Sequence, residues 1–237
     1  GKPVLNFGET GWHSRQSLNL LLNVIGDGHS PSEVIFYDGV NDVGTQCRIE
    51  NSIVPTHARE KRIHDAIVFK SNQERKKTFI NNRKLFQFLL EPYIILYRKF
   101  STNISQKLNS KLLFDCHENQ HKAKSIASHL VNNWYISYLI SKEKKFNFYA
   151  ILQPTLFSTG SQYKYFNSST KERLPIYKKQ FDIVYPLIYD EIVEKCNHDK
   201  YFCSRIIDGR KWIDSTSKVF IDHNHLTKEG NKIIVSK

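Results

Sequence analysis

The sequence predicts an α/β fold built on a parallel sheet, because short buried strands alternate with helices along the chain. Residues 33–37 and 146–152 are runs of β-branched and aromatic residues that end at turn residues, which is typical of buried strands. Residues 14–25 repeat leucine at helical spacing before a Gly-Asp-Gly turn, which is typical of a helix with one apolar face. Strands that alternate with helices pair in parallel, in a three-layer α/β/α arrangement.

The rest of the chain supplies further elements of the same kind. An apolar run at residues 3–8 predicts a strand before the first helix. Further along we expect a helix at 126–140, a mainly helical segment at 171–196, a short extended stretch at Ile206 and Ile207, and a short helix from Thr227. Such sheets place their sites at the carboxyl ends of the strands, so the residues that follow the strands are the candidates for function.

The chain is expected to form one domain, residues 1–237. A length of 237 residues with 40% hydrophobic side chains can bury one substantial core. From residue 43 to about residue 125 the pattern changes to long, mixed helical segments, which predicts a helical insertion in the sheet domain. The sequence contains no Met and opens on Gly-Lys-Pro directly before an apolar run, so we expect that an N-terminal part has been removed.

A formal net charge of +12 raises the question of nucleic-acid binding. The basic clusters are short, far apart and mixed with acidic residues, which is typical of solvated surface. We therefore expect no nucleic-acid partner and keep a basic nucleic-acid-binding protein only as an alternative. No apolar run approaches the roughly 20 residues of a membrane-spanning helix, so no membrane span is expected in these residues.

Four cysteines, Cys47, Cys116, Cys196 and Cys203, lack the paired spacing of a zinc site. Their even number permits disulfides from Cys47 to Cys116 and from Cys196 to Cys203, which would suit an oxidising compartment; four buried thiols are the alternative. We expect no metal and no cofactor. The compartment stays open, with a preference for the cell envelope or secretion, and the sequence predicts no oligomeric state.

Three short motifs follow expected strands. They are Asn-Phe-Gly-Glu-Thr-Gly at residues 6–11, Gly-Val-Asn-Asp at residues 39–42, and Asp-His-Asn-His at residues 222–225. Each motif alone is common in turns and loops. In this order and with their flanking residues they resemble signature blocks of the SGNH (GDSL-type) hydrolases, and the resemblance runs from Val4 to Val235. It implies a serine esterase of flavodoxin-like fold, and the flanks look like those of a bacterial branch.

The resemblance implies a Ser-His-Asp mechanism in which His225 is the general acid and base and Asp222 orients it. A serine hydroxyl is a poor nucleophile until an imidazole takes its proton, and a carboxylate fixes the imidazole tautomer. The resemblance also implies an oxyanion hole formed by the backbone N–H of Gly11 and the side-chain amide of Asn41. Asp42, beside Asn41, is expected to brace its own loop.

The Gly-Asp-Ser block that carries the family's nucleophile does not occur in the sequence. Ser30 ends a similar Gly-Asp-Gly-His-Ser segment, but that segment precedes a strand and is expected at the opposite edge of the sheet. Ser14 is better explained as the N-cap of the first helix. We therefore expect the nucleophilic serine upstream of this chain, and a family member without catalysis is the alternative.

Three side chains are candidates for substrate binding. Trp12 and His13 follow Gly11 in the expected oxyanion loop, and Gln153 follows the strand at residues 146–152. Ordinary loop and turn positions are the alternative explanation for all three. The helical insertion is a candidate lid over the pocket.

The expected activity is therefore hydrolysis of an acyl or acetyl ester, with a small-molecule or polysaccharide ester as substrate. The resemblance implies carbohydrate, cell-envelope or lipid esters and identifies neither the acyl group nor the alcohol. The alternative on the same fold is a module that binds an acylated carbohydrate without hydrolysing it, or that transfers its acyl group.

Overall fold

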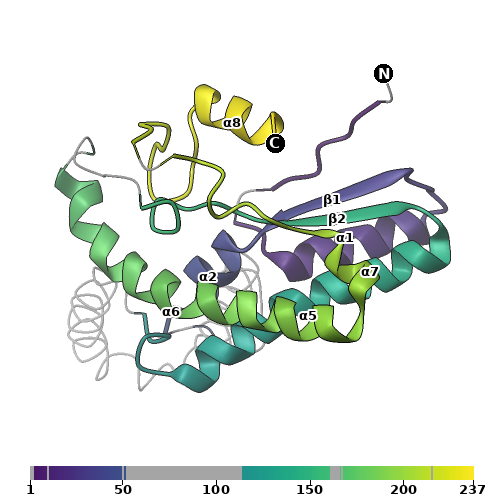
Figure 1. Cartoon of the computed structure of the whole chain (residues 1–237), viewed down its shortest axis with the longest axis horizontal. Helices are drawn as coiled ribbons and strands as arrows, with labels where there is room; N and C mark the ends of the chain where they lie inside the picture. The colour runs from purple at the N-terminus through teal and green to yellow at the C-terminus, as the bar shows by residue number, and fades with distance from the viewer. Residues whose placement is uncertain are drawn as a thin grey trace, which may run out of the picture. The chain divides into compact units, whose positions relative to one another are not determined.

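The computed structural model describes residues 3–9, 11–49, 51, 114–160, 166, 168–214 and 216–237, which all belong to one compact unit (Figure 1). The elements in chain order are α1 (Ser14–Gly26), β1 (Glu33–Asp38), α2 (Val40–Gln46), α5 (Gln120–Lys144), β2 (Asn147–Leu152), α6 (Ser168–His198), α7 (Lys200–Cys203), β3 (Ile206–Asp208) and α8 (Lys228–Val235). The predicted α/β class is confirmed.

The strands of this unit pair in parallel in the order β1-β2-β3, as the sequence predicts. Their register places Asp38, the last residue of β1, opposite Leu152 at the end of β2, and Leu152 opposite Asp208 at the end of β3. The carboxyl ends of the described strands therefore lie level with one another. The segments that follow the strands leave the sheet at this common edge (Figure 1).

Helices α1 and α5 pack against one face of the sheet. Side chains alternate between the faces of a strand, and Phe36 and Phe148 on the covered face are buried with their rings 5.1 Å apart. Trp134 of α5 is fully buried in the same core. On the opposite face Ile35 is 57% exposed and Tyr37 is 38% exposed.

The strand expected at residues 3–8 is not formed. Residues 3–9 carry no regular secondary structure, and Val4 and Leu5 are 90% and 75% exposed. Figure 1 shows this segment as an extended trace that lies apart from β1. An apolar run becomes a strand only where a neighbouring strand supplies hydrogen bonds and a core covers one face, and no described strand pairs with this segment. The prediction was wrong because pairing depends on a partner.

The helical insertion predicted at residues 43–125 falls mostly outside the described residues. Only its ends are described: α2 reaches into its beginning and α5 starts before its end. The single-domain assignment for residues 1–237 therefore stays a prediction.

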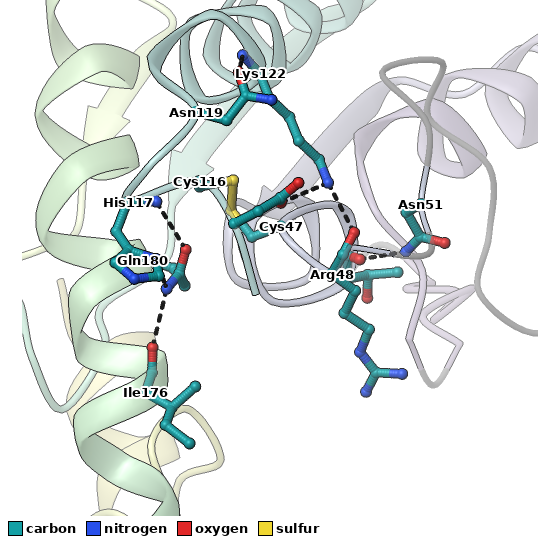
Figure 2. The surroundings of a disulfide bond; sticks show 11 residues. Cys47, Arg48, Asn51, Cys116, His117, Asn119, Lys122, Ile176 and Gln180 are labelled. Atoms are coloured by element: carbon teal, nitrogen blue, oxygen red, sulfur yellow. Dashed lines mark hydrogen bonds and ion pairs between the residues drawn. A yellow bond between two sulfur atoms is a disulfide. The ribbon is translucent and has the colours of Figure 1, made fainter. Parts of the chain in front are cut away.

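The two ends of that segment are fastened together at a neck, which we define as residues 47–48 and 114–116. A disulfide joins Cys47 to Cys116, both fully buried (Figure 2). Arg48 pairs with Phe114 in an antiparallel bridge. Figure 2 also shows the buried Lys122 of α5, whose Nζ donates to the Arg48 carbonyl oxygen at 2.7 Å. The neck thus fixes the end of α2 to the beginning of α5.

A second disulfide joins Cys196 near the end of α6 to Cys203 at the end of α7. The structure therefore contains both disulfides that the even cysteine count permits. None of the described helices combines the length and apolar composition needed to cross a membrane.

The two disulfides should contribute unequally to stability, because the Cys47–Cys116 link spans 69 residues and the Cys196–Cys203 link only 7. Loop-closure entropy predicts that the pair Cys47→Ala and Cys116→Ala lowers the free energy of unfolding by about 4 kcal/mol. The pair Cys196→Ala and Cys203→Ala should lower it by about 2 kcal/mol. Urea unfolding of both double variants under non-reducing conditions checks this, and a larger loss from the short link would contradict it.

Candidate active site

The predicted pair of Asp222 and His225 lies on a tight loop closed by a bridge between Phe220 and Leu226. One carboxylate oxygen of Asp222 accepts the backbone N–H groups of Asn224 and His225, at 2.9 and 2.8 Å. The other lies 2.7 Å from Nδ1 of the His225 ring. The structure therefore brings these two predicted side chains together.

Hydrogen bonding decides the charge of Asp222. Partial burial raises its pKa, but the hydrogen bonds from His225 and Asn224 lower the pKa by more than burial raises it. The pKa therefore lies below its ordinary value. An ionised carboxylate has no proton to donate, so the proton between the two groups belongs to Nδ1 of His225. In the neutral ring Nε2 then carries a lone pair, and the His225 side chain is 67% exposed. This is the form in which an imidazole acts as a general base.

The predicted oxyanion donors come from the Gly11 loop and the first turn of α2, which touch each other. Gly11 has a φ of 79°, a left-handed conformation that favours glycine. The carbonyl oxygen of the next residue, the half-buried Trp12, accepts a hydrogen bond of 2.7 Å from Nδ2 of Asn41. An amide nitrogen carries two hydrogens, so this bond leaves the second one for another acceptor. The Gly11 loop and Asn41 are thus held side by side.

Asp42 braces its own turn, as predicted, and its carboxylate also reaches the start of α1. Its buried carboxylate accepts the Gly39 N–H at 3.3 Å within the loop. It also accepts from the Ser14 hydroxyl at 2.6 Å and from the Ser14 backbone N–H at 3.2 Å. Because Ser14 begins α1 and Asp42 lies in the first turn of α2, one carboxylate joins the starts of the two helices.

The N-cap of α1 is His13 and not Ser14. Nδ1 of His13 accepts the Arg15 backbone N–H at 3.3 Å, while the Ser14 hydroxyl is taken by Asp42. The sequence favoured Ser14 because hydroxyl side chains are common caps, but a tertiary acceptor competes for this one. The His13 ring is completely buried, so we do not include it among the residues proposed to contact substrate.

Gln153 is also held by hydrogen bonds within the fold. Its Oε1 accepts the Val40 backbone N–H at 3.2 Å, at the start of α2, where helical N–H groups lack partners in the helix. Its backbone carbonyl accepts from the Tyr185 hydroxyl at 3.1 Å. A few residues further, Leu156 donates its N–H to the carbonyl oxygen of His223 at 3.0 Å. The turn after β2 (residues 153–158) therefore contacts both the Asn41 helix and the His225 loop.

Asp38 is part of the site's support that the sequence did not reveal. It ends β1, is buried, and accepts from the Trp134 indole at 3.0 Å and from the Ser17 hydroxyl at 3.1 Å. Burial, and next the negative charge of Asp42, raise its pKa from 3.8 to about 7, in spite of these hydrogen bonds. An acidic residue directly after the apolar and aromatic run at residues 34–37 is the signal that could have identified it.

The two serines that were rejected as nucleophiles, Ser30 and Ser14, both lie in the described part of the chain. Ser30 is exposed and precedes β1, so it lies toward the amino-terminal edge of the sheet, as predicted. Ser14 is buried, and its hydroxyl is held by Asp42 and by Nδ2 of Asn133 at 2.9 Å.

A pocket of about 430 Å³ lies beside the His225 loop, between the turn after β2, α6 and the segment that follows β3. The residues of its wall relevant here are Phe157, Phe181, Tyr185, Arg210 and Lys211. Its wall thus combines aromatic and basic side chains, and the carboxylate of Asp182 also lines it. Within the described ranges, no group of three or more His, Cys, Asp or Glu side chains is arranged to hold a metal ion.

Comparison with known proteins gives one match. A family model described as GDSL-like Lipase/Acylhydrolase matches residues 1–237, the whole of the sequence. No curated protein and no solved structure shows significant similarity to the chain.

Asp38 gives the stability of the protein a distinct pH dependence. Because its pKa is raised in the folded state, Asp38 is destabilising once it ionises, and this penalty grows as the pH rises from 3.8 to about 7. Asp38→Asn keeps an oxygen for Trp134 and gives Ser17 a donor, so it should raise the melting temperature at pH 8. The gain should shrink toward pH 4 in calorimetric melts. The exposed Asp27 gives the matched control, Asp27→Asn, and a pH-independent gain from Asp38→Asn would contradict the assignment.

Proposed function

Because the chain belongs to the GDSL-like lipase/acylhydrolase family, which hydrolyses esters, we propose that its site works through an acyl-enzyme with His225 as general acid and base. The observation that carries the proposal is the 2.7 Å contact between Nδ1 of His225 and the Asp222 carboxylate. It fixes the tautomer that leaves Nε2 free to take a proton. The contact between the Gly11 loop and Asn41 supports the second part of the mechanism, the oxyanion hole.

In the proposed first step, Nε2 of His225 takes the proton of a serine hydroxyl as its oxygen attacks the ester carbonyl. Asp222 stabilises the imidazolium, and the Gly11 N–H and the second Asn41 amide hydrogen bind the oxyanion. His225 then gives its proton to the leaving alcohol. A water molecule, activated by the same Nε2, releases the acid from the serine.

We further propose that the serine comes from outside these 237 residues. The sequence has no Gly-Asp-Ser block, and Ser14 and Ser30 are unsuitable by position. In the described sheet β1 pairs only with β2, and Ile35 and Tyr37 leave apolar surface exposed beside its unpaired edge. Such an edge favours the addition of another strand.

The proposed substrates are acyl or acetyl esters of carbohydrates, cell-envelope polymers or lipids. The mixed aromatic and basic wall of the pocket beside the His225 loop is compatible with a polar alcohol such as a sugar. Both disulfides favour folding in an oxidising compartment, which supports secretion or the cell envelope. The absence of the serine block from the sequence keeps a binding or acyl-transfer module as the second candidate function.

An extended protein that includes the upstream serine block should hydrolyse p-nitrophenyl acetate and an acetylated sugar, whereas the 237-residue chain should not. In the extended protein, His225→Ala should abolish turnover because the serine then has no base. The control His29→Ala alters an exposed histidine before β1 and should leave turnover unchanged. An extended protein that is folded but inactive on both esters would favour the binding module.

In the same assay Asn41→Ala should lower kcat by about 100- to 1,000-fold with little change in KM, because it removes one oxyanion donor. The bond to the Trp12 carbonyl is lost as well, which should cost only about 1 kcal/mol of stability. Asn23→Ala, at an exposed position of α1, is the matched control. A fall in kcat of less than about threefold would remove Asn41 from the oxyanion hole.

A further inference from the structure

His223 lies between the two proposed catalytic side chains in sequence, and its ring is inserted among aromatic rings. It stacks on Tyr177 of α6, with centroids 4.2 Å apart and planes 18° apart. Phe157 and Phe181 lie 6.2 and 6.1 Å away. The ring thus fills a site bounded by α6 and by the turn after β2.

The His223 ring is neutral in this position. Burial lowers its pKa to about 4, the carboxylate of Asp222 opposes this shift, and His225, when protonated, acts in the same direction as burial. A neutral imidazole packs against aromatic faces without the cost of burying a charge. At physiological pH His223 therefore behaves as a small aromatic side chain.

The backbone of His223 is fixed as well, since its carbonyl oxygen accepts the N–H of the buried Leu156 at 3.0 Å. The side chains of its neighbours Asp222 and His225 are 35% and 67% exposed, and the His225 carbonyl oxygen is bonded within the loop, by the Ile221 N–H at 2.7 Å. A pair on a short exposed loop is held in place only through the rest of that loop. Of the residues from Asp222 to His225, His223 is the one whose ring packs against another element.

The part of α6 on which His223 stacks makes further contacts of its own. On α6, Tyr177 also meets Phe114 of the neck, with ring centroids 5.1 Å apart. One helical turn along, the buried Gln180 accepts the His117 N–H at 3.1 Å (Figure 2). The disulfide-linked neck therefore fixes the part of α6 on which His223 stacks.

From these contacts we propose that His223 is a positioning residue: its stacked ring fixes the loop so that Nδ1 of His225 stays on the Asp222 carboxylate. This inference rests on the proposed function of that pair. It predicts that an aromatic ring at position 223 is needed to keep the His225 tautomer, and that a titratable proton at this position is not.

The test uses the 237-residue chain labelled with ¹⁵N-histidine, and NMR reads the tautomer of the His225 ring at neutral pH. The unaltered chain and His223→Phe should both show His225 with its proton on Nδ1. His223→Ala should shift His225 toward the tautomer mixture of a free imidazole, because the loop no longer holds it against Asp222. An unchanged tautomer in His223→Ala would overturn the proposal, as would a shifted one in His223→Phe.

A matched variant separates positioning from a general loss of stability. Tyr135 belongs to a different aromatic cluster, 5.2 Å from Phe202, so Tyr135→Ala also removes a packed ring. It should leave the His225 tautomer unchanged, whereas Tyr177→Ala should reproduce the effect of His223→Ala. A tautomer shift in Tyr135→Ala equal to that in His223→Ala would overturn the specific role of His223.

The tautomer readout needs no catalysis, so it is independent of the proposed function. In the extended protein His223→Ala should lower kcat by at least about tenfold with little change in KM, and His223→Phe should restore it. No esterase activity in the extended protein, together with the expected tautomer shifts, would remove the proposed function and leave the positioning role intact. Full kcat in His223→Ala of an active extended protein would overturn the positioning role alone.

Discussion

The carboxylate of Asp42 holds the starts of two helices at one point. Ser14 at the beginning of α1 donates both its hydroxyl and its backbone N–H to it, and Gly39 donates from the start of α2. A buried negative charge is stable only where donors surround it, and helix N-termini offer unpaired N–H groups and a positive partial charge. Because Trp12 precedes α1 and Asn41 lies in the first turn of α2, their mutual contact follows from this carboxylate.

The same region carries a second buried acid, and α5 supports both. Asn133 donates to the Ser14 hydroxyl that binds Asp42, and its neighbour Trp134 donates to Asp38. Two carboxylates so close cannot both be ionised without cost, and the raised pKa of Asp38 expresses that cost. The side of the site that carries Gly11 and Asn41 thus depends on two neighbouring groups of buried hydrogen bonds, one around each carboxylate. The opposite side, with His225, depends on aromatic packing.

The features that could be predicted from the sequence are local ones. Helix α1 and strands β1 and β2 follow from apolar periodicity within a single segment, and the Asp222–His225 pair needs only a three-residue spacing on one loop. The prediction that Asn41 and Gly11 act together required the family resemblance, because nothing in either segment shows that the two segments meet.

The features that were missed depend on distant partners. The run at residues 3–8 has strand composition but no described strand to pair with. His13 replaces Ser14 as N-cap because Asp42, 28 residues away, takes the serine hydroxyl. Asp38 becomes a buried acid because Ser17 of α1 and Trp134 of α5 pack over it. Cysteine pairing was left open because spacing alone does not decide whether two thiols meet.

The neck has a consequence for how this fold tolerates change in length. Its disulfide brings the Cα atoms of Cys47 and Cys116 to 5.2 Å. Lys122 of α5 adds a hydrogen bond to the Arg48 carbonyl oxygen. The entropic cost of closing a loop grows only logarithmically with its length. The stretch of chain between Arg48 and Phe114 therefore begins and ends at fixed points. Residues can be gained or lost within it while α2, and with it Asn41, keeps its place.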